Sequence, residues 1–303
     1  MTDALLSVLV ALFLWWFGTG ALFWVAQRAI TRGGRGIAMA GASVLLAVAV
    51  WGLWTLGAGT THEAAYLSFA CGLAVWAWVE LGLLLGYVTG PEKRPCPPGL
   101  AGPERFFRAL GVVLWHEIAL LALGVLLVWL TWGAANQIGA WTFVLLAAMR
   151  ISAKLNLFLG VPYPPGLPLP GHLVHMATYF RRSSPTALMP AAITVATAVA
   201  TLVAWRAANP ALDPFHVTAY MLFWTMLVLG IVEHWFLILP VEESVIWQWF
   251  IRARNSTKPA PVCSRSNRDP AHRDSFPKPQ DGDREDGLTV ATPLQPTAQG
   301  GLR

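Results

Sequence analysis

The segment that most constrains the fold is an apolar run over residues 139–160, which contains two permanent cations, Arg150 and Lys154, and one amide, Asn156. The run is long enough to cross a bilayer as a helix. A cation at mid-membrane costs about 2.5–3.5 kcal/mol unless it finds a partner or reaches the interface. Because Arg150 and Lys154 are four residues apart, they project from one helix face. We therefore expect another part of the chain to supply carboxylates at the same depth.

The composition is typical of a membrane protein. Hydrophobic residues make up 55% of the chain and charged residues only 12%, whereas soluble domains contain about 25% charged residues. The net charge of +5 does not require a nucleic-acid partner, because cytoplasmic loops of membrane proteins are enriched in Lys and Arg. Cys71, Cys96 and Cys263 have no paired spacing, so we expect neither a disulfide nor a zinc site.

Seven apolar segments predict an all-α, polytopic membrane protein with seven transmembrane helices. The first is expected to be a retained span, because no basic residue precedes it. Gly160 and the prolines that follow it predict the end of the fifth span, while prolines and charges prevent residues 89–107 from being helical throughout. The predicted spans are residues 5–26, 37–57, 64–88, 108–131, 139–160, 187–207 and 215–239.

The distribution of basic residues predicts the orientation of these spans. In the seven-span arrangement the Lys and Arg residues of the loops fall on one side, and only Arg206 falls on the other. The positive-inside rule makes the first side cytoplasmic, which places the N-terminus outside and the C-terminus inside. Tryptophans collect at the opposite helix ends, as expected for an interfacial belt: Trp51, Trp54, Trp129, Trp132, Trp141 and Trp205.

Two amphipathic segments are predicted at the cytoplasmic interface. Residues 171–182 place Leu173, Met176 and Phe180 on one helical stripe. A second stripe follows the last span and comprises Val245, Ile246, Trp249 and Phe250. Beyond it the chain is polar and rich in proline, so we expect residues 1–252 to form the transmembrane domain and residues 253–303 a disordered cytoplasmic tail.

Polar residues of the third, fourth, fifth and seventh spans are predicted to form one buried layer, which we call the polar layer. A helix rises 1.5 Å per residue, and by this measure these residues fall at one level in the cytoplasmic half of the membrane. Ionisable clusters inside membranes are candidate functional sites. The candidate ligand-binding residues are Glu80, His116, Glu117, Arg150, Lys154, Asn156, Glu233 and His234.

The charges of the polar layer leave several roles open. If each fixed cation pairs with a carboxylate, one acid and two imidazoles remain. The layer could have a purely structural role and join helices. It could instead hold a pigment, a quinone or a lipid headgroup, bind a metal, or conduct protons. We predict no metal site, because neighbouring residues of a helix diverge by 100° and the Glu-x-x-His spacing of di-iron bundles is absent.

Several blocks of the sequence resemble one known family. They are FLWWF at 13–17, TGP at 89–91, PCPPGL at 95–100, His116-Glu117, RISAKLNLFLGVP at 150–162 and Glu233-His234-Trp235. In order and spacing they resemble the PuhE-type photosynthetic complex assembly proteins of purple and related phototrophic bacteria, over about residues 1–250. The resemblance implies a multi-span protein of the bacterial inner (cytoplasmic or intracytoplasmic) membrane, encoded near the reaction-centre H subunit. The resemblance implies no agreed catalytic residues.

Together these observations predict a non-enzymatic assembly factor that influences reaction-centre and light-harvesting complexes or the supply of bacteriochlorophyll. Its expected partners are membrane lipids, subunits of those complexes or pigment-synthesis enzymes, and no nucleic acid. The ligand is open, with a bacteriochlorophyll-type pigment or a quinone favoured over a metal ion. The alternative is a metal-dependent membrane oxidoreductase acting on a tetrapyrrole, a quinone or an isoprenoid lipid.

Overall fold

The computed structural model describes residues 2–29, 32–164 and 169–240, and every regular element in these ranges is a helix. Seven of the helices are long and apolar enough to cross a membrane, which supports the prediction of a multi-pass membrane protein. They are α1 (Thr2–Arg28), α2 (Arg32–Thr55), α3 (His62–Leu84), α4 (Gly102–Leu130), α5 (Ile138–Leu159), α7 (Leu188–Ala207) and α8 (Pro214–Phe236). Three short helices accompany them: η1 (Leu56–Ala58), η2 (Gly171–Leu173) and α6 (Val174–Ala177).

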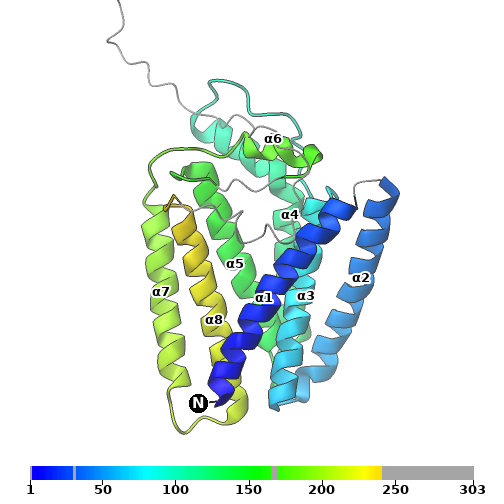
Figure 1. Ribbon diagram of the computed structural model, residues 1–303, viewed down its shortest axis with the longest axis vertical. Helices are drawn as coiled ribbons and strands as arrows, with labels where there is room; N and C mark the ends of the chain where they lie inside the picture. The colour runs from blue at the N-terminus through cyan, green and yellow to red at the C-terminus, as the bar shows by residue number, and fades with distance from the viewer. Residues whose placement is uncertain (1, 30–31, 165–168, 241–303) are drawn as a thin grey trace, which may run out of the picture. The chain divides into compact units, whose positions relative to one another are not determined.

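Helix α3 occupies the centre of the helix bundle. It packs against α1, α2, α4, α5 and α8 (Figure 1), and half of its most apolar window is buried. Helices α2 and α7 are peripheral, since only 11% and 17% of their windows are buried, and each packs mainly against one neighbour. Side chains that face outward from peripheral spans are apolar because lipid surrounds them.

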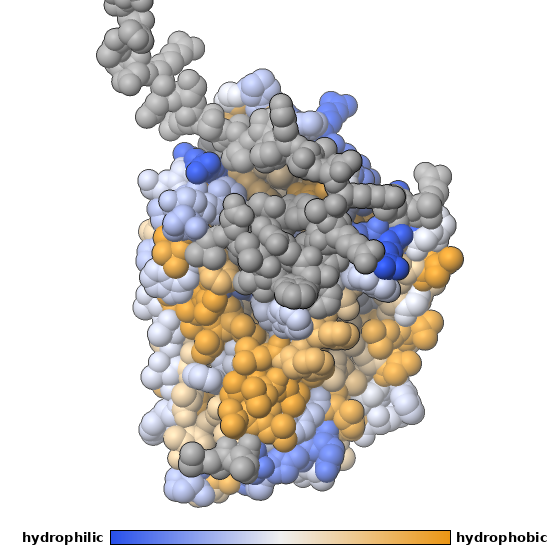
Figure 2. Space-filling view, in the orientation of Figure 1, coloured by the Kyte–Doolittle hydropathy of each residue, from blue (hydrophilic) through white to orange (hydrophobic). Residues whose placement is uncertain are grey.

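The two ends of the bundle differ in composition. One end, here called the arginine-rich end, is where α1 ends and α2 and α4 begin. The other, the tryptophan-rich end, carries the six tryptophans of the predicted belt, and all six are exposed. Figure 2 shows hydrophobic residues over the middle of the visible face, with the most hydrophilic residues toward the ends. This pattern is typical of a bilayer-embedded surface.

Several predicted helix boundaries differ from the observed ones, and two of these differences have a clear local reason. Helix α3 ends at Leu84 and not at residue 88, because Gly86 has φ 86° and the amides of Tyr87 and Val88 turn back to the carbonyl of Gly82. Helix α4 begins at Gly102 and not at residue 108, because Pro103 lies in the first turn, where a missing amide has no cost. The predicted stop at Gly160 is confirmed, with φ 140° directly after Leu159.

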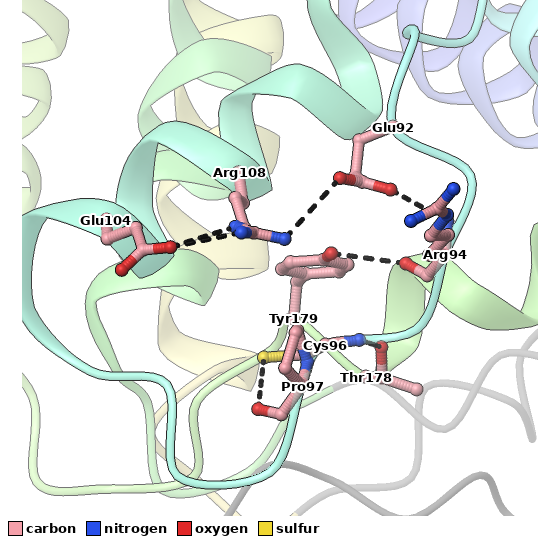
Figure 3. Close-up of polar contacts among 8 residues, drawn as sticks. All are labelled: Glu92, Arg94, Cys96, Pro97, Glu104, Arg108, Thr178 and Tyr179. Atoms are coloured by element: carbon pink, nitrogen blue, oxygen red, sulfur yellow. Dashed lines mark hydrogen bonds and ion pairs between the residues drawn. The ribbon is translucent and has the colours of Figure 1, made fainter. Parts of the chain in front are cut away.

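A cap, formed by residues 85–101 and 169–183, covers the arginine-rich ends of α4 and α5. Buried Arg105 donates hydrogen bonds to the carbonyl oxygens of Phe158 and Tyr179, and so joins α4 to the end of α5. The Tyr179 hydroxyl donates to the carbonyl of Arg94, as Figure 3 shows. At the rim of the cap Arg108 lies between Glu104 and Glu92. These contacts hold the ends of α4 and α5 at a fixed separation.

The predicted amphipathic helix over residues 171–182 is shorter than expected. Only η2 and α6 are helical there, although Leu173 and Met176 are buried as the stripe requires. The helix stops at Thr178, whose hydroxyl accepts the amide of Cys96 and donates to the carbonyl of His175. Thr178 is itself buried. The second predicted stripe and the tail, residues 253–303, lie outside the described residues.

A close backbone contact joins α3 to α5 near the tryptophan-rich end. A side chain at Gly72 or Gly139 would collide with the backbone of the partner helix. The same contact is hydrogen-bonded, because the Ser68 hydroxyl accepts the Gly139 amide at 3.0 Å. Small residues at such contacts let membrane helices approach closely. This approach brings the charged residues of α3 and α5 within reach of each other.

Replacement of Gly72 by alanine is expected to destabilise the protein by about 1–3 kcal/mol, because the new methyl group forces α3 away from α5. The thermal unfolding midpoint of the detergent-purified protein measures this change. The control is Gly41→Ala on α2, where an added methyl group meets open space. Equal midpoints for the two variants would contradict the close contact.

Candidate functional site

The structure brings most of the polar layer together by direct contact. Glu80 comes from α3, His116 and Glu117 from α4, and Arg150 and Lys154 from α5. The five side chains form one chain of contacts, which are ion pairs and hydrogen bonds except for the 3.4 Å approach of His116 to Glu80. Opposite charges from these three helices therefore meet in the structure, as predicted.

The first link of this chain is the pair between Arg150 and Glu80. The guanidinium donates from Nε to Oε1 at 3.0 Å and from Nη2 to Oε2 at 3.1 Å. Two parallel hydrogen bonds between these ions form the strongest and most directional of the common side-chain pairs. Only 7% of the Glu80 side chain is exposed. The pair thus fixes the rotation and height of α3 relative to α5.

The second link is formed by Lys154, which binds two residues of α4 at once. Its ammonium donates to Oε1 of Glu117 at 2.7 Å and to Nδ1 of His116 at 2.8 Å. An ammonium has no acceptor, so Nδ1 of His116 carries the lone pair and Nε2 carries the proton. That Nε2 lies 3.4 Å from Oε1 of Glu80, in a geometry that makes no hydrogen bond. The neutral imidazole therefore lies between the two ion pairs and is hydrogen-bonded to Lys154 alone.

The resulting chain has no net charge. It contains two cations, two carboxylates and one neutral imidazole, in the order Glu117, Lys154, His116, Glu80, Arg150. Isolated charges in an apolar interior are far more costly than paired ones. This arrangement is consistent with the prediction that each fixed cation pairs with a carboxylate. Which cation pairs with which carboxylate could not be predicted from the numbers of charged residues.

His234 belongs to a separate hydrogen-bonded group between α8 and α5. Its Nδ1 donates to the carbonyl of Gly230 at 2.8 Å, so its Nε2 accepts a hydrogen bond from the Ser152 hydroxyl at 2.9 Å. The amide of Asn156 donates to the carbonyl of Ser152 at 2.9 Å, while its buried Oδ1 has no hydrogen-bond partner. Glu233 directly precedes His234 on α8. The residues of the polar layer thus fall into two neighbouring groups, and each group includes residues of α5.

Sequence reasoning missed Ser152, which supplies the link from α5 to His234. Its position in the RISAK block, between Arg150 and Lys154, was a usable signal, since serines in spans often bond across helices. It also missed Arg105, which was expected in a loop and is buried in the cap. No pattern indicates that Arg105 would point inward.

Backbone pairing between the loop and α4 positions His116 and Glu117. The amide of Trp115 donates to the carbonyl of Thr89 at 3.1 Å, and the amide of Glu92 donates to the carbonyl of Gly111 at 3.2 Å. Gly90 lies so close to α4 that a side chain there would collide with the carbonyl of Gly111. The loop therefore holds α4 by its backbone one residue before His116.

The arrangement can bind polar groups but offers no metal centre within the described ranges. No group of three or more His, Cys, Asp or Glu residues in residues 2–29, 32–164 and 169–240 is placed to hold a metal ion. Two surface pockets lie apart from the polar layer. One, of about 450 Å³, is bounded by Glu92, Glu104 and Arg108 at the cap, and the other, of about 490 Å³, lies between the start of α7 and the end of α8.

The fold and the site together define a class, namely a multi-pass helical membrane protein with a buried ionic layer. Over residues 1–258 the chain matches a family described as "Protein of unknown function (DUF3623)", and it belongs to that family. It is also 36% identical, over 254 residues, to a Rhodobacter capsulatus protein described as an "Uncharacterized 30.4 kDa protein in puhA 5'region". That match covers 83% of this chain and 92% of the relative. No solved structure matches the chain.

A double-mutant cycle tests the pair between Glu117 and Lys154. Either Glu117→Gln or Lys154→Met leaves one buried charge without its partner, so each is expected to cost about 3–5 kcal/mol. The double variant removes both charges and is expected to lose at least about 1 kcal/mol less than the sum of the single losses. Thermal midpoints measure all three, with exposed Glu104→Gln as control. Strictly additive losses would show that the two groups do not interact.

The role of Gly90 can be tested against its own contact partner. Gly90→Ala is expected to cost about 1–3 kcal/mol, because its methyl group has no room against α4. Gly111→Ala places a methyl group at an ordinary 3.5 Å from Cβ of Glu92 and is expected to be neutral or stabilising, since alanine favours helix. The thermal unfolding midpoints of the two variants measure these changes. A lower midpoint for Gly111→Ala than for Gly90→Ala would show that the loop contact is wrong.

Proposed function

We propose that the protein is a non-enzymatic assembly factor of the photosynthetic membrane, which acts on reaction-centre and light-harvesting complexes or on the supply of bacteriochlorophyll. The observation that carries this proposal is the extended similarity to a relative whose description places it in the puhA 5' region. The resemblance of residues 150–162 and the other blocks to the PuhE-type proteins supports the same process. The partners are then subunits of those complexes or pigment-synthesis enzymes.

In this proposal the polar layer holds a ligand or a partner group and does not catalyse a reaction. Glu80, Glu117 and Lys154 are tied into ion pairs. Both histidines are hydrogen-bonded as neutral rings. A general acid or base needs a proton that it can release or accept near neutral pH, and groups held in tight pairs are poorly suited to this. Convergent polar groups between helices are well suited to orienting a ligand.

The location proposed is the bacterial inner membrane, with the N-terminus outside and the arginine-rich end in the cytoplasm. The basic residues near the helix ends support this orientation, because Arg28, Arg35, Arg94 and Arg108 lie at one end of the bundle and Arg206 at the other. The cap would then face the cytoplasm, where pigment-synthesis enzymes could reach it. The alternative of a metal-dependent oxidoreductase has no specific observation in its favour.

Complementation in a phototrophic bacterium that lacks its own copy of the gene tests this function. Glu233→Gln is expected to lower the absorbance of membrane-bound pigment–protein complexes while the protein itself accumulates normally, because Glu233 lies at the polar layer without a part in the Glu80 and Glu117 pairs. Glu104→Gln, on the exposed start of α4, is the matched control.

Two results would contradict the proposed function. One is full recovery of pigment–protein complexes by every polar-layer variant that accumulates normally. The other is native protein, purified from photosynthetically grown cells, that carries no pigment, photosynthetic subunit or pigment-synthesis enzyme.

A further inference from the structure

Arg150 differs from the rest of the chain of ion pairs because much of its side chain is accessible. It lies nine residues before the end of α5, or about 14 Å along the helix. At this depth 39% of its side chain is exposed, compared with 7% for Glu80 and 9% for Lys154. A permanent cation this far from a helix end is normally enclosed. Its accessible edge therefore needs an explanation.

The path of α1 explains why Arg150 is left uncovered. Near the tryptophan-rich end, α1 packs against α3 and α8, with Ala11 in the same cluster as Phe69 and Leu222. Near the arginine-rich end it packs instead against α2 and α3, through Ala26 and Ala29. Figure 1 shows α1 crossing the bundle obliquely. Arg150 lies on α5 beside Glu80 of α3, in the half of the bundle where α1 packs against α2 and α3 and no longer against α8.

The guanidinium has more donors than Glu80 uses. Arginine carries five N–H groups in a planar fork, and Glu80 takes one from Nε and one from Nη2. The Nη1 donors have no acceptor within the described part of the chain. In an apolar setting an unmade hydrogen bond from a charged donor costs more than one from a neutral donor. A ligand that brings an acceptor to this edge would recover that energy.

The local charge selects the kind of acceptor. Arg150 is already neutralised by Glu80. A carboxylate or phosphate would bring a second negative charge next to the Glu80 carboxylate at low dielectric, which is unfavourable. A neutral carbonyl oxygen accepts the same hydrogen bonds without that cost. The ligand must also be apolar elsewhere, because the surrounding spans are.

We propose that the accessible edge of Arg150 binds the carbonyl oxygen of a neutral amphiphile, which reaches it from the bilayer. This inference rests on the proposed function, because it names the ligand class that the polar layer holds. Three sources share the chemistry: a quinone, a tetrapyrrole with a ring ketone or ester, and the ester carbonyl of a lipid. Arg150 acts as a binding residue, and Glu80 positions it.

Titration of the full-length protein in detergent with decylubiquinone tests the assignment, because a bound quinone quenches tryptophan fluorescence. We expect saturable quenching, about tenfold weaker in Arg150→Lys, which keeps the charge but loses the forked donors. The control is Arg28→Lys, whose guanidinium stacks on Trp24 at the end of α1. Non-saturable quenching, or equal affinity in Arg150→Lys and native protein, would overturn the proposal.

Competition on the native protein needs no variant and separates the sources. Displacement of the quinone by pheophorbide methyl ester, or by a diester phospholipid but not its diether analogue, supports the proposal and identifies the source of the carbonyl. Displacement by decanoate at pH 8 as effective as by any neutral carbonyl overturns it in favour of an anion site. If binding fails while Glu233→Gln still lowers the complexes in cells, the ligand class is wrong and the proposed function stands.

Discussion

The pairing of Arg150 with Glu80 is the interaction on which the rest of the structure depends. A guanidinium about 14 Å from the end of an apolar helix is tolerable only beside a fixed counter-charge, and the two parallel hydrogen bonds supply one with a defined direction. Because the pair joins α3 to α5, it sets their relative height and rotation. The bridge through His116 and Lys154 then extends the same constraint to α4.

The backbone contacts around this chain make the pairing geometry possible. Gly72 and Gly139 let α3 and α5 approach at the tryptophan-rich end, and Gly90 lets the loop bind α4 close to His116. In each case a methyl group would separate the elements that carry the charges. Arg105 holds the ends of α4 and α5 together from the cap. The apolar packing sets the distances between the helices. The chain of ion pairs then determines which of the helix arrangements that this packing allows is adopted.

Much of this could be predicted from the sequence, because membrane helices obey strong rules of length and charge. The seven apolar segments followed from hydropathy, and the meeting of Glu80, Glu117, Arg150 and Lys154 followed from depth along helices. The pairing scheme did not follow, since it depends on the rotation of each helix, which packing fixes. Neither did the use of Ser152 as the partner of His234, because the hydrogen bond crosses 82 residues of sequence. The predicted end of α3 and the predicted start of α4 were wrong, because they did not take into account a local turn and a proline at the start of a helix.

The arrangement of α3 and α5 requires Glu80 to be an ionised partner of Arg150 inside the bundle. Infrared spectroscopy of protein labelled with ¹³C-carboxyl glutamate, in native form and as Glu80→Gln, measures the charge of this carboxyl group. At neutral pH we expect Glu80→Gln to remove intensity only from the ionised carboxylate band. A protonated carboxyl band that is present in the native protein and disappears in Glu80→Gln would contradict it.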